Sequence, residues 1–340
     1  MKILHISHHY GCLKDHQYIC KKLNLCLESI FTPWMGDGTN FPRGYFTPTK
    51  DLCNDIWNKN KDYFNSFDYI ITSDTAPLSR IFLQNINNFK GKLNIWVCNR
   101  FDYDVQGDYY YYSLFREASK NPNINIIPYT NFETYWMNSF GISPNKETIT
   151  PMGLSLTEKI NSREQHYIGY DDTQSMTEAF GDVLVSRYHN DSKFQNTVSI
   201  CKNQNLKATV ANYRGPQEIK NIVNNFICFF VLPEQYSKLV TFEFMQNLMP
   251  VIIPSKNYLL NLAKQPNYFF GSGINEQTVN FCEWYNEYYS KYAIYIDSMD
   301  ELYDCVQFIK KNKKEIQSTI KEQADIHTKK TLMQWKNIYV

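Results

Sequence analysis

A short stretch in the C-terminal half places a cation and a carboxylate where they could bind a nucleotide. The apolar run 229–232 predicts a buried strand, and residues 237–248 predict the helix that follows it. The first N–H groups of a helix starting at Ser237, together with the ammonium group of Lys238, suit a diphosphate. Glu243, about one and a half turns further on, can accept two hydroxyl hydrogen bonds from a ribose. The alternative is that Glu243 faces solvent on an amphipathic helix.

The same stretch resembles the donor-binding segment of retaining GT-B glycosyltransferases. That segment has a buried strand, a proline, an acidic residue, a short loop, a helix with a second glutamate, and then G-x-P-V-I. In the run LPEQYSKLVTFEFMQNLMPVIIPS, Leu239 falls on the leucine of the pattern and Glu243 on its second glutamate. Gln235 stands where the first glutamate belongs, next to Glu234, and Lys238 replaces the usual glycine. Together with NYRGPQEI upstream, the run also resembles a less characterised branch of the family 4-like group, found in protists and large DNA viruses.

The resemblance implies a metal-independent enzyme that moves a sugar from a nucleotide diphosphate sugar to a hydroxyl acceptor, with retention. The acceptor would be a glycan, glycolipid or glycoprotein. No cofactor is expected beyond that co-substrate, for which a UDP-sugar is favoured over a GDP-sugar. In retaining chemistry the leaving phosphate can accept the proton of the acceptor, so no protein base is needed.

Two rival functions stay open on the same fold. A nucleotide-sugar epimerase or an inverting transferase would need a positioned base, for which Asp15 or Asp102 could serve. A carbohydrate- or partner-binding module that has lost catalysis would also fit the departures at Gln235 and Lys238.

Basic residues after two further predicted strands are candidate donor ligands. Arg187 and Lys193 follow the strand VLVSR, where the resembled family carries its basic pair. Cations at that place would stabilise the charge on a departing nucleotide diphosphate. Tyr213 and Arg214 follow a later strand, where a loop could pack on the base or the phosphates. The alternative for both segments is an exposed turn, which Gly215 also indicates.

A loop in the N-terminal half supplies the candidate catalytic residues. Asn99, Arg100 and Asp102 follow the predicted strand 93–98, at the carboxyl edge where open α/β sheets bind ligands. Arg100 and Asp102 are candidates for contacting the transferred sugar, the acceptor hydroxyl or each other. An Arg–Asp ion pair that only stabilises the loop is the alternative.

The loop after the first strand is the second candidate on the acceptor side, together with Asn99. It contains Gly11, Lys14 and Asp15, and the GT-B arrangement would point it into the cleft. The alternative for Asp15 is to be the N-cap of the helix expected over residues 15–23.

The elements that must position these residues alternate along the chain. Apolar and β-branched runs predict strands at 2–7, 27–32, 69–73, 93–98, 124–129, 148–150, 183–187, 206–211, 227–232 and 251–253. Helices are expected between them, at 15–23, 194–203, 237–248 and 258–263 among others. Strands alternating with helices predict parallel, doubly wound sheets.

The chain has 340 residues, which exceeds what one hydrophobic core usually supports. We therefore expect an α/β protein of GT-B architecture, with two Rossmann-like domains facing across a cleft. Residues 1–152 would form the acceptor-side domain, 153–180 the connection, and 181–325 the nucleotide-sugar-binding domain. Residues 326–340, with Trp335, would form a helix that crosses back to the N-terminal domain. The charged stretch 301–321 predicts a surface helix.

Composition and missing motifs exclude other classes. With 35 basic and 34 acidic residues, the chain lacks the broad positive charge on which nucleic-acid binding rests. No apolar run fits a signal peptide or a membrane span, so a cytoplasmic protein without a transmembrane segment is expected. The nine cysteines include no CxxC pair, so reduced thiols and no metal site are expected. The motifs GxGxxG, GxxxxGK[ST] and GxSxG are absent, which disfavours dehydrogenases, P-loop enzymes and hydrolases.

Overall fold

The structure, a computed structural model, describes residues 1–32, 41–42, 45–154, 180–186, 191–210, 222–265, 273–286 and 291–339, and for 191–195 only the backbone. The chain divides into two compact units. Unit 1 contains Met1–Pro151 and Thr331–Val340, and unit 2 contains the described residues between them. Most of the expected connection, residues 155–179, lies outside the described residues.

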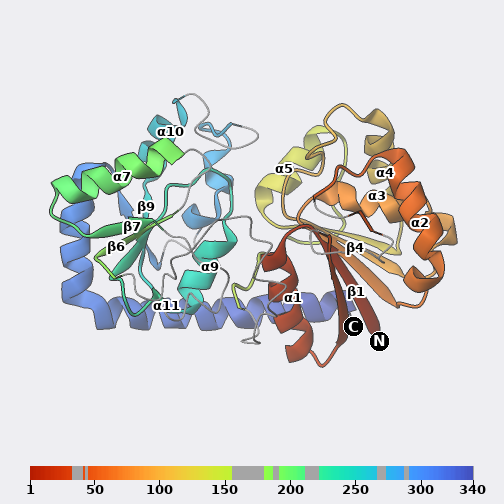
Figure 1. The fold of residues 1–340 in the computed structure, drawn as a ribbon, viewed down its shortest axis with the longest axis horizontal. Coiled ribbons are helices and arrows are strands. Elements are labelled where there is room, and N and C mark those ends of the chain that lie inside the picture. The colour runs from red at the N-terminus through yellow and green to blue at the C-terminus, as the bar shows by residue number, and fades with distance from the viewer. Residues whose placement is uncertain are drawn as a thin grey trace. The chain divides into compact units, whose positions relative to one another are not determined.

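Unit 1 is built on a five-stranded parallel sheet in the order β2-β1-β3-β4-β5 (Figure 1). The strands are β1 (Lys2–Ser7), β2 (Cys26–Phe31), β3 (Tyr69–Ser73), β4 (Lys92–Val97) and β5 (Ile124–Pro128). All five lie where the apolar runs predict them. The prediction of a parallel, doubly wound sheet is confirmed.

The strand expected at residues 148–150 is wrong. Ile149 makes one backbone hydrogen bond to the end of β5, from its N–H to the Pro128 carbonyl at 2.9 Å. Its own carbonyl accepts from the indole of Trp96 at 2.9 Å, and the Thr148 carbonyl accepts from Gln334 at 3.1 Å. Because side chains take these backbone groups, the segment cannot extend the sheet.

Helices cover both faces of the unit 1 sheet. They are α1 (Tyr10–Lys22), α2 (Lys50–Phe64), α3 (Arg80–Leu83), α4 (Tyr109–Ala118) and α5 (Asn131–Ser139), with short 3-10 turns at Ala76–Ser79 and Ile86–Asn88. Leu4 and Ile6 of β1 belong to the core shared with α2, α3 and α4. His5 lies between them in sequence and contacts His16 of α1 instead, with ring centroids 4.8 Å apart. Side chains thus alternate between the two faces, as a pleated strand requires.

Unit 2 repeats the plan with a second five-stranded parallel sheet, in the order β10-β9-β8-β6-β7. Its strands are β6 (Val183–Val185), β7 (Ala208–Val210), β8 (Cys228–Phe230), β9 (Val251–Pro254) and β10 (Ala293–Ile296). The sequence patterns miss β10, a four-residue strand that pairs with β9. Numbered within its own unit, each sheet has the order 2-1-3-4-5.

The helices of unit 2 are α7 (Asp191–Asn203), α9 (Leu239–Gln246), α10 (Lys256–Ala263) and α11 (Leu302–Tyr339), with 3-10 turns at Val279–Phe281, Glu283–Tyr285 and Met299–Glu301. No helix among the described residues is long and apolar enough to cross a membrane. The separate surface and C-terminal helices expected from the sequence are one element, α11, kinked at Asn312.

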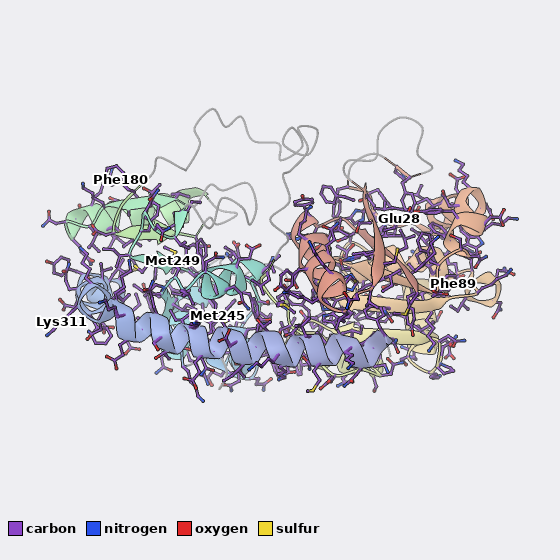
Figure 2. The ribbon with its side chains drawn as sticks, turned by 90° about the horizontal axis from the view of Figure 1, so that it is seen from below. Glu28, Phe89, Phe180, Met245, Met249 and Lys311 are labelled. Carbon is purple, nitrogen blue, oxygen red and sulfur yellow. The ribbon has the colours of Figure 1, made fainter. Side chains whose placement is uncertain are left out.

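Helix α11 packs first in unit 2 and then in unit 1. Gln317 donates to the Leu248 carbonyl at 3.2 Å, just after α9, where Figure 2 labels Met245 and Met249. The last residues, Thr331–Val340, belong to unit 1. There the ring of Trp335 lies 5.4 Å from that of Trp96.

Gly153 holds the backbone against α9 and allows a test of this packing. Its φ is +76°, and a Cβ built there would lie 2.4 Å from the backbone carbon of Phe242. Gly153→Ala combines left-handed strain with overpacking, so we expect a loss of roughly 3 kcal/mol in the free energy of unfolding. Gly107→Ala, with φ +83° and no atom within 4 Å of the new methyl, is the matched control. It should lose only about 1 kcal/mol in urea unfolding, and equal losses for both would contradict the close approach to Phe242.

Candidate functional site

Each sheet has a topological switch point, where neighbouring strands continue into connections that leave in opposite directions. In the order 2-1-3-4-5 this point lies between the first and third strands, and ligands of open α/β sheets bind beyond the carboxyl ends there. The pair is β1 and β3 in unit 1, and β6 and β8 in unit 2. Residues that directly follow these four strands are therefore the first candidates for a site.

In unit 2 the switch point carries a nearly buried ion pair. The Nζ of Lys238 lies 2.9 Å from the Oε1 of Glu234, and the two side chains are 10% and 7% exposed. Nζ also donates to the Oγ of Ser186, the residue directly after β6, at 3.4 Å. Glu234 follows β8, and Lys238 directly precedes α9. The carboxyl ends of β6 and β8 thus meet at one ammonium group.

Helix α9 begins two residues later than the sequence predicts. Its first residue is Leu239, which is half-buried, and Lys238 is the N-cap, without a side-chain capping bond. Lysine has no acceptor atom, so its side chain cannot satisfy the first N–H groups of the helix. The hydroxyl of Ser237 donates to the Oε2 of Glu283 at 2.5 Å. The prediction of a helix start at Ser237 is wrong, because the backbone is still extended at Lys238.

Glu243 lies in the buried part of α9. Only 7% of it is exposed, and Phe242 and Phe244 on either side are fully buried. The alternative in which Glu243 faces solvent is therefore wrong. Its role toward a ribose stays a prediction.

Four further donor candidates cannot be placed. Arg187, Tyr213 and Arg214 lie outside the described residues. Lys193 is in the first turn of α7, where the structure describes only the backbone.

In unit 1 the switch point carries a carboxyl group that the sequence patterns do not single out. Asp74 directly follows β3 and has a φ of +73°. Its Oδ1 accepts from the Nδ2 of Asn99, which follows β4, at 3.2 Å. Burial raises the pKa of Asp74 to about 7; Cys12 and Asp104 also raise it, and His9 opposes them. A carboxyl group with such a pKa can exchange a proton near neutral pH.

Arg100 and Asp102 contact each other, with the guanidinium Nε 3.5 Å from the Asp102 Oδ1. Asp102 is 2% exposed and also accepts from Trp136 at 2.9 Å and from Tyr112 at 3.1 Å. The Arg100 guanidinium lies 4.9 Å from the Trp136 ring centroid. This geometry favours the loop-stabilising alternative, and the catalytic roles stay predictions.

The three remaining acceptor-side candidates all lie on α1. This helix begins at Tyr10, and its N-cap is His9, which accepts from the Cys12 N–H at 3.3 Å. Gly11 is therefore helical, which contradicts the expected loop. Asp15 is 2% exposed within the helix, so its assignment as N-cap is wrong. Lys14 places its ammonium 5.0 Å from the ring centroid of Tyr10.

Comparisons with known proteins concern the fold. No protein-family profile matches the chain, and no curated protein sequence matches it. Among solved structures, Anabaena Alr3699/HepE in complex with UDP-glucose is similar over 100% of this chain and 98% of its own, with 9% identity and a TM-score of 0.50. Methanocaldococcus jannaschii UDP-GlcNAc 2-epimerase in complex with UDP-GlcNAc and UDP is similar over 91% of this chain and 92% of its own, with 12% identity and a TM-score of 0.46.

The similarity to HepE extends over both sheets and shows the class of fold. The chain has the GT-B fold, with two Rossmann-like α/β units. The fold class predicted from the sequence is thereby confirmed.

Proposed function

We propose that this chain is a glycosyltransferase that moves a sugar from a nucleotide diphosphate sugar to a hydroxyl acceptor, with retention and without a metal. The observation that carries the proposal is the Lys238–Glu234 pair with Ser186, at the switch point of the unit 2 sheet. This is the place where parallel α/β sheets bind nucleotides, and it coincides with the start of α9.

The roles within the donor site follow from charge and position. Glu234 holds the ammonium group of Lys238 at the start of α9. That charge and the first N–H groups of the helix would together bind the diphosphate. Glu243 would accept hydroxyl hydrogen bonds from the ribose. Arg187, Lys193, Tyr213 and Arg214 complete the proposed donor site, and the UDP-glucose bound to HepE supports a UDP-sugar.

A second function is favoured by one specific observation in unit 1. Asp74 has a pKa raised to about 7 by burial and follows a switch-point strand. An inverting transferase or a nucleotide-sugar epimerase needs such a base, whereas retaining transfer does not. In this second function Asp74 is the base, the role for which the sequence suggested Asp15 or Asp102.

The products of the reaction distinguish the two functions. The chain would be incubated with UDP-glucose or UDP-GlcNAc and sugar or lipid-linked acceptors, in buffer containing EDTA. Free UDP together with a glycosylated acceptor whose new linkage keeps the donor's anomeric configuration by NMR supports retaining transfer. An inverted linkage or an epimerised sugar nucleotide supports the function based on Asp74. Turnover that needs added metal would contradict the metal-independent proposal.

A further inference from the structure

Two cysteines from distant parts of the sequence meet at the switch point of unit 1. Cys12 lies in the first turn of α1, and Cys98 directly follows β4. Their Sγ atoms are 3.9 Å apart. A disulfide needs about 2.05 Å between the sulfurs, so rotation of the two side chains would have to close about 2 Å.

The surroundings of Cys12 favour its thiolate. The hydrogen bond between the Cys12 and Cys98 sulfurs is the largest cause that lowers the pKa of Cys12, to about 5, against the opposing effect of burial. His9 and Ser73 lower this pKa further. The start of α1 adds the positive end of a helix dipole, which also favours a thiolate.

The other buried cysteines lie in surroundings that oppose a thiolate. Burial raises the pKa of Cys20 and of Cys53 to about 12, and that of Cys201 to about 11. It also raises the pKa of Cys98, which therefore keeps its proton, and this thiol donates to the Trp96 carbonyl at 3.5 Å. The pair thus combines an activated sulfur with a neighbouring thiol.

We propose that Cys12 and Cys98 form a dithiol site that reacts with hydrogen peroxide or another small hydroperoxide. Cys12 is 5% exposed, so a small oxidant can reach it more readily than a bulky disulfide can. Cys98 is half-buried. The site lies in unit 1 beside Asp74, whose pKa Cys12 helps to raise, and its reaction with a peroxide does not use the sugar donor.

The reaction has two steps. The Cys12 thiolate attacks the terminal peroxide oxygen, so that an S–O bond forms and the O–O bond breaks. The leaving hydroxide, or the alkoxide of an organic hydroperoxide, takes up a proton to become water or an alcohol. This oxidises Cys12 to a sulfenic acid. The Cys98 sulfur then attacks the Cys12 sulfur; the S–S bond forms, the S–O bond breaks, and hydroxide leaves with the Cys98 proton as water. Cys12 is the reacting thiol and Cys98 the resolving thiol.

The test is peroxide oxidation followed by mass spectrometry of the full chain. The wild-type protein should lose two hydrogen atoms, and peptide mapping should find Cys12 linked to Cys98. In Cys98→Ser, which keeps a small polar side chain beside Cys12 but removes the resolving thiol, dimedone should trap a sulfenic acid on Cys12. Cys12→Ser should form no disulfide, and a reductant should reverse the wild-type reaction.

Cys26→Ser is the matched control, because Cys26 is exposed and lies elsewhere in unit 1. This variant should form the Cys12–Cys98 disulfide at the wild-type rate. In the wild-type protein, Cys12 should react with peroxide roughly tenfold faster than Cys26. No linkage between Cys12 and Cys98, or oxidation of Cys26 before Cys12, would overturn the proposal. Neither result depends on nucleotide-sugar binding, so this proposal can fail while the proposed function stands.

Discussion

Lys238→Gln is expected to weaken the binding of UDP by roughly 100-fold. A charge-assisted hydrogen bond contributes about 1.5–3 kcal/mol, which corresponds to a factor of about 10–100 in affinity. The variant also leaves the buried carboxylate of Glu234 without its ammonium partner, 2.9 Å away in the wild type, and this charge would repel a diphosphate. Calorimetric titration with UDP in EDTA-containing buffer measures the change.

Two further variants separate this effect from a general loss of charge. Lys207→Gln removes an exposed lysine just before β7, where the amino ends of the strands lie, whereas Lys238 lies at their carboxyl ends. This variant should bind UDP like the wild type. The double variant Lys238→Gln/Glu234→Gln also lacks the Glu234 carboxylate that would repel the diphosphate. It should therefore bind UDP more tightly than Lys238→Gln does. If Lys238→Gln binds UDP as tightly as Lys207→Gln does, Lys238 is not a diphosphate ligand.

Asp74→Asn is the second substitution with a large expected effect, and it separates the two proposed functions. If Asp74 is the base of an inverting transferase or an epimerase, kcat should fall by about 10²–10⁴-fold. The wild-type rate should then rise with pH through about 7, as the Asp74 carboxyl loses its proton, and this rise should disappear in the variant. Retaining transfer without a base predicts a change of less than about tenfold. Steady-state rates from pH 5 to pH 9 provide the test.

The same substitution should stabilise the fold above neutral pH. Burial raises the pKa of Asp74 from 3.8 to about 7, so between these values the folded chain binds more protons than the unfolded chain. This group therefore stabilises the fold less and less as pH rises through that window. Asparagine carries no charge and tolerates the φ of +73°, so Asp74→Asn should gain on the order of 1–2 kcal/mol at pH 8 and little at pH 4.

Asp104→Asn is the control for both measurements. Asp104 has a φ of +66°, accepts from the Tyr45 hydroxyl at 2.7 Å and helps to raise the pKa of Asp74. This variant should keep kcat within a few-fold, and any rise of the rate with pH should move to lower pH. A rate loss as large as that of Asp74→Asn would show that any change of charge around Asp74 lowers the rate, so the loss could not be assigned to a missing base.

Of the described strands, all but β10 could be predicted, because parallel strands are usually buried on both faces. Their sequences therefore form continuous apolar runs, as in β8 (Cys228–Phe230) and β9 (Val251–Pro254). Helix starts were harder to predict, because they depend on capping. Helix α1 is capped by His9, which is not among the usual capping residues, and α9 by Lys238 without a capping bond.

Site residues that lie close together in the sequence could be predicted, whereas those that only the fold brings together could not. Lys238 and Glu243 could be recognised because they lie five residues apart at the start of one helix and within it, in a segment that matches a known pattern. Asp74, Cys12 and Cys98 are separated by long stretches of sequence, and the neighbouring positions of β1, β3 and β4 bring them together. The signal that could have found Asp74 is its place directly after the third strand, at the predicted switch point.

The most direct test of the central claim is calorimetric titration of the unaltered chain with UDP and GDP in EDTA. The proposed donor site predicts saturable binding of UDP in the micromolar range and weaker binding of GDP. Glu243→Ala should weaken the binding of UDP at least tenfold, because the ribose loses a charged acceptor. Absence of binding by either nucleotide, with no effect of Glu243→Ala, would contradict the account.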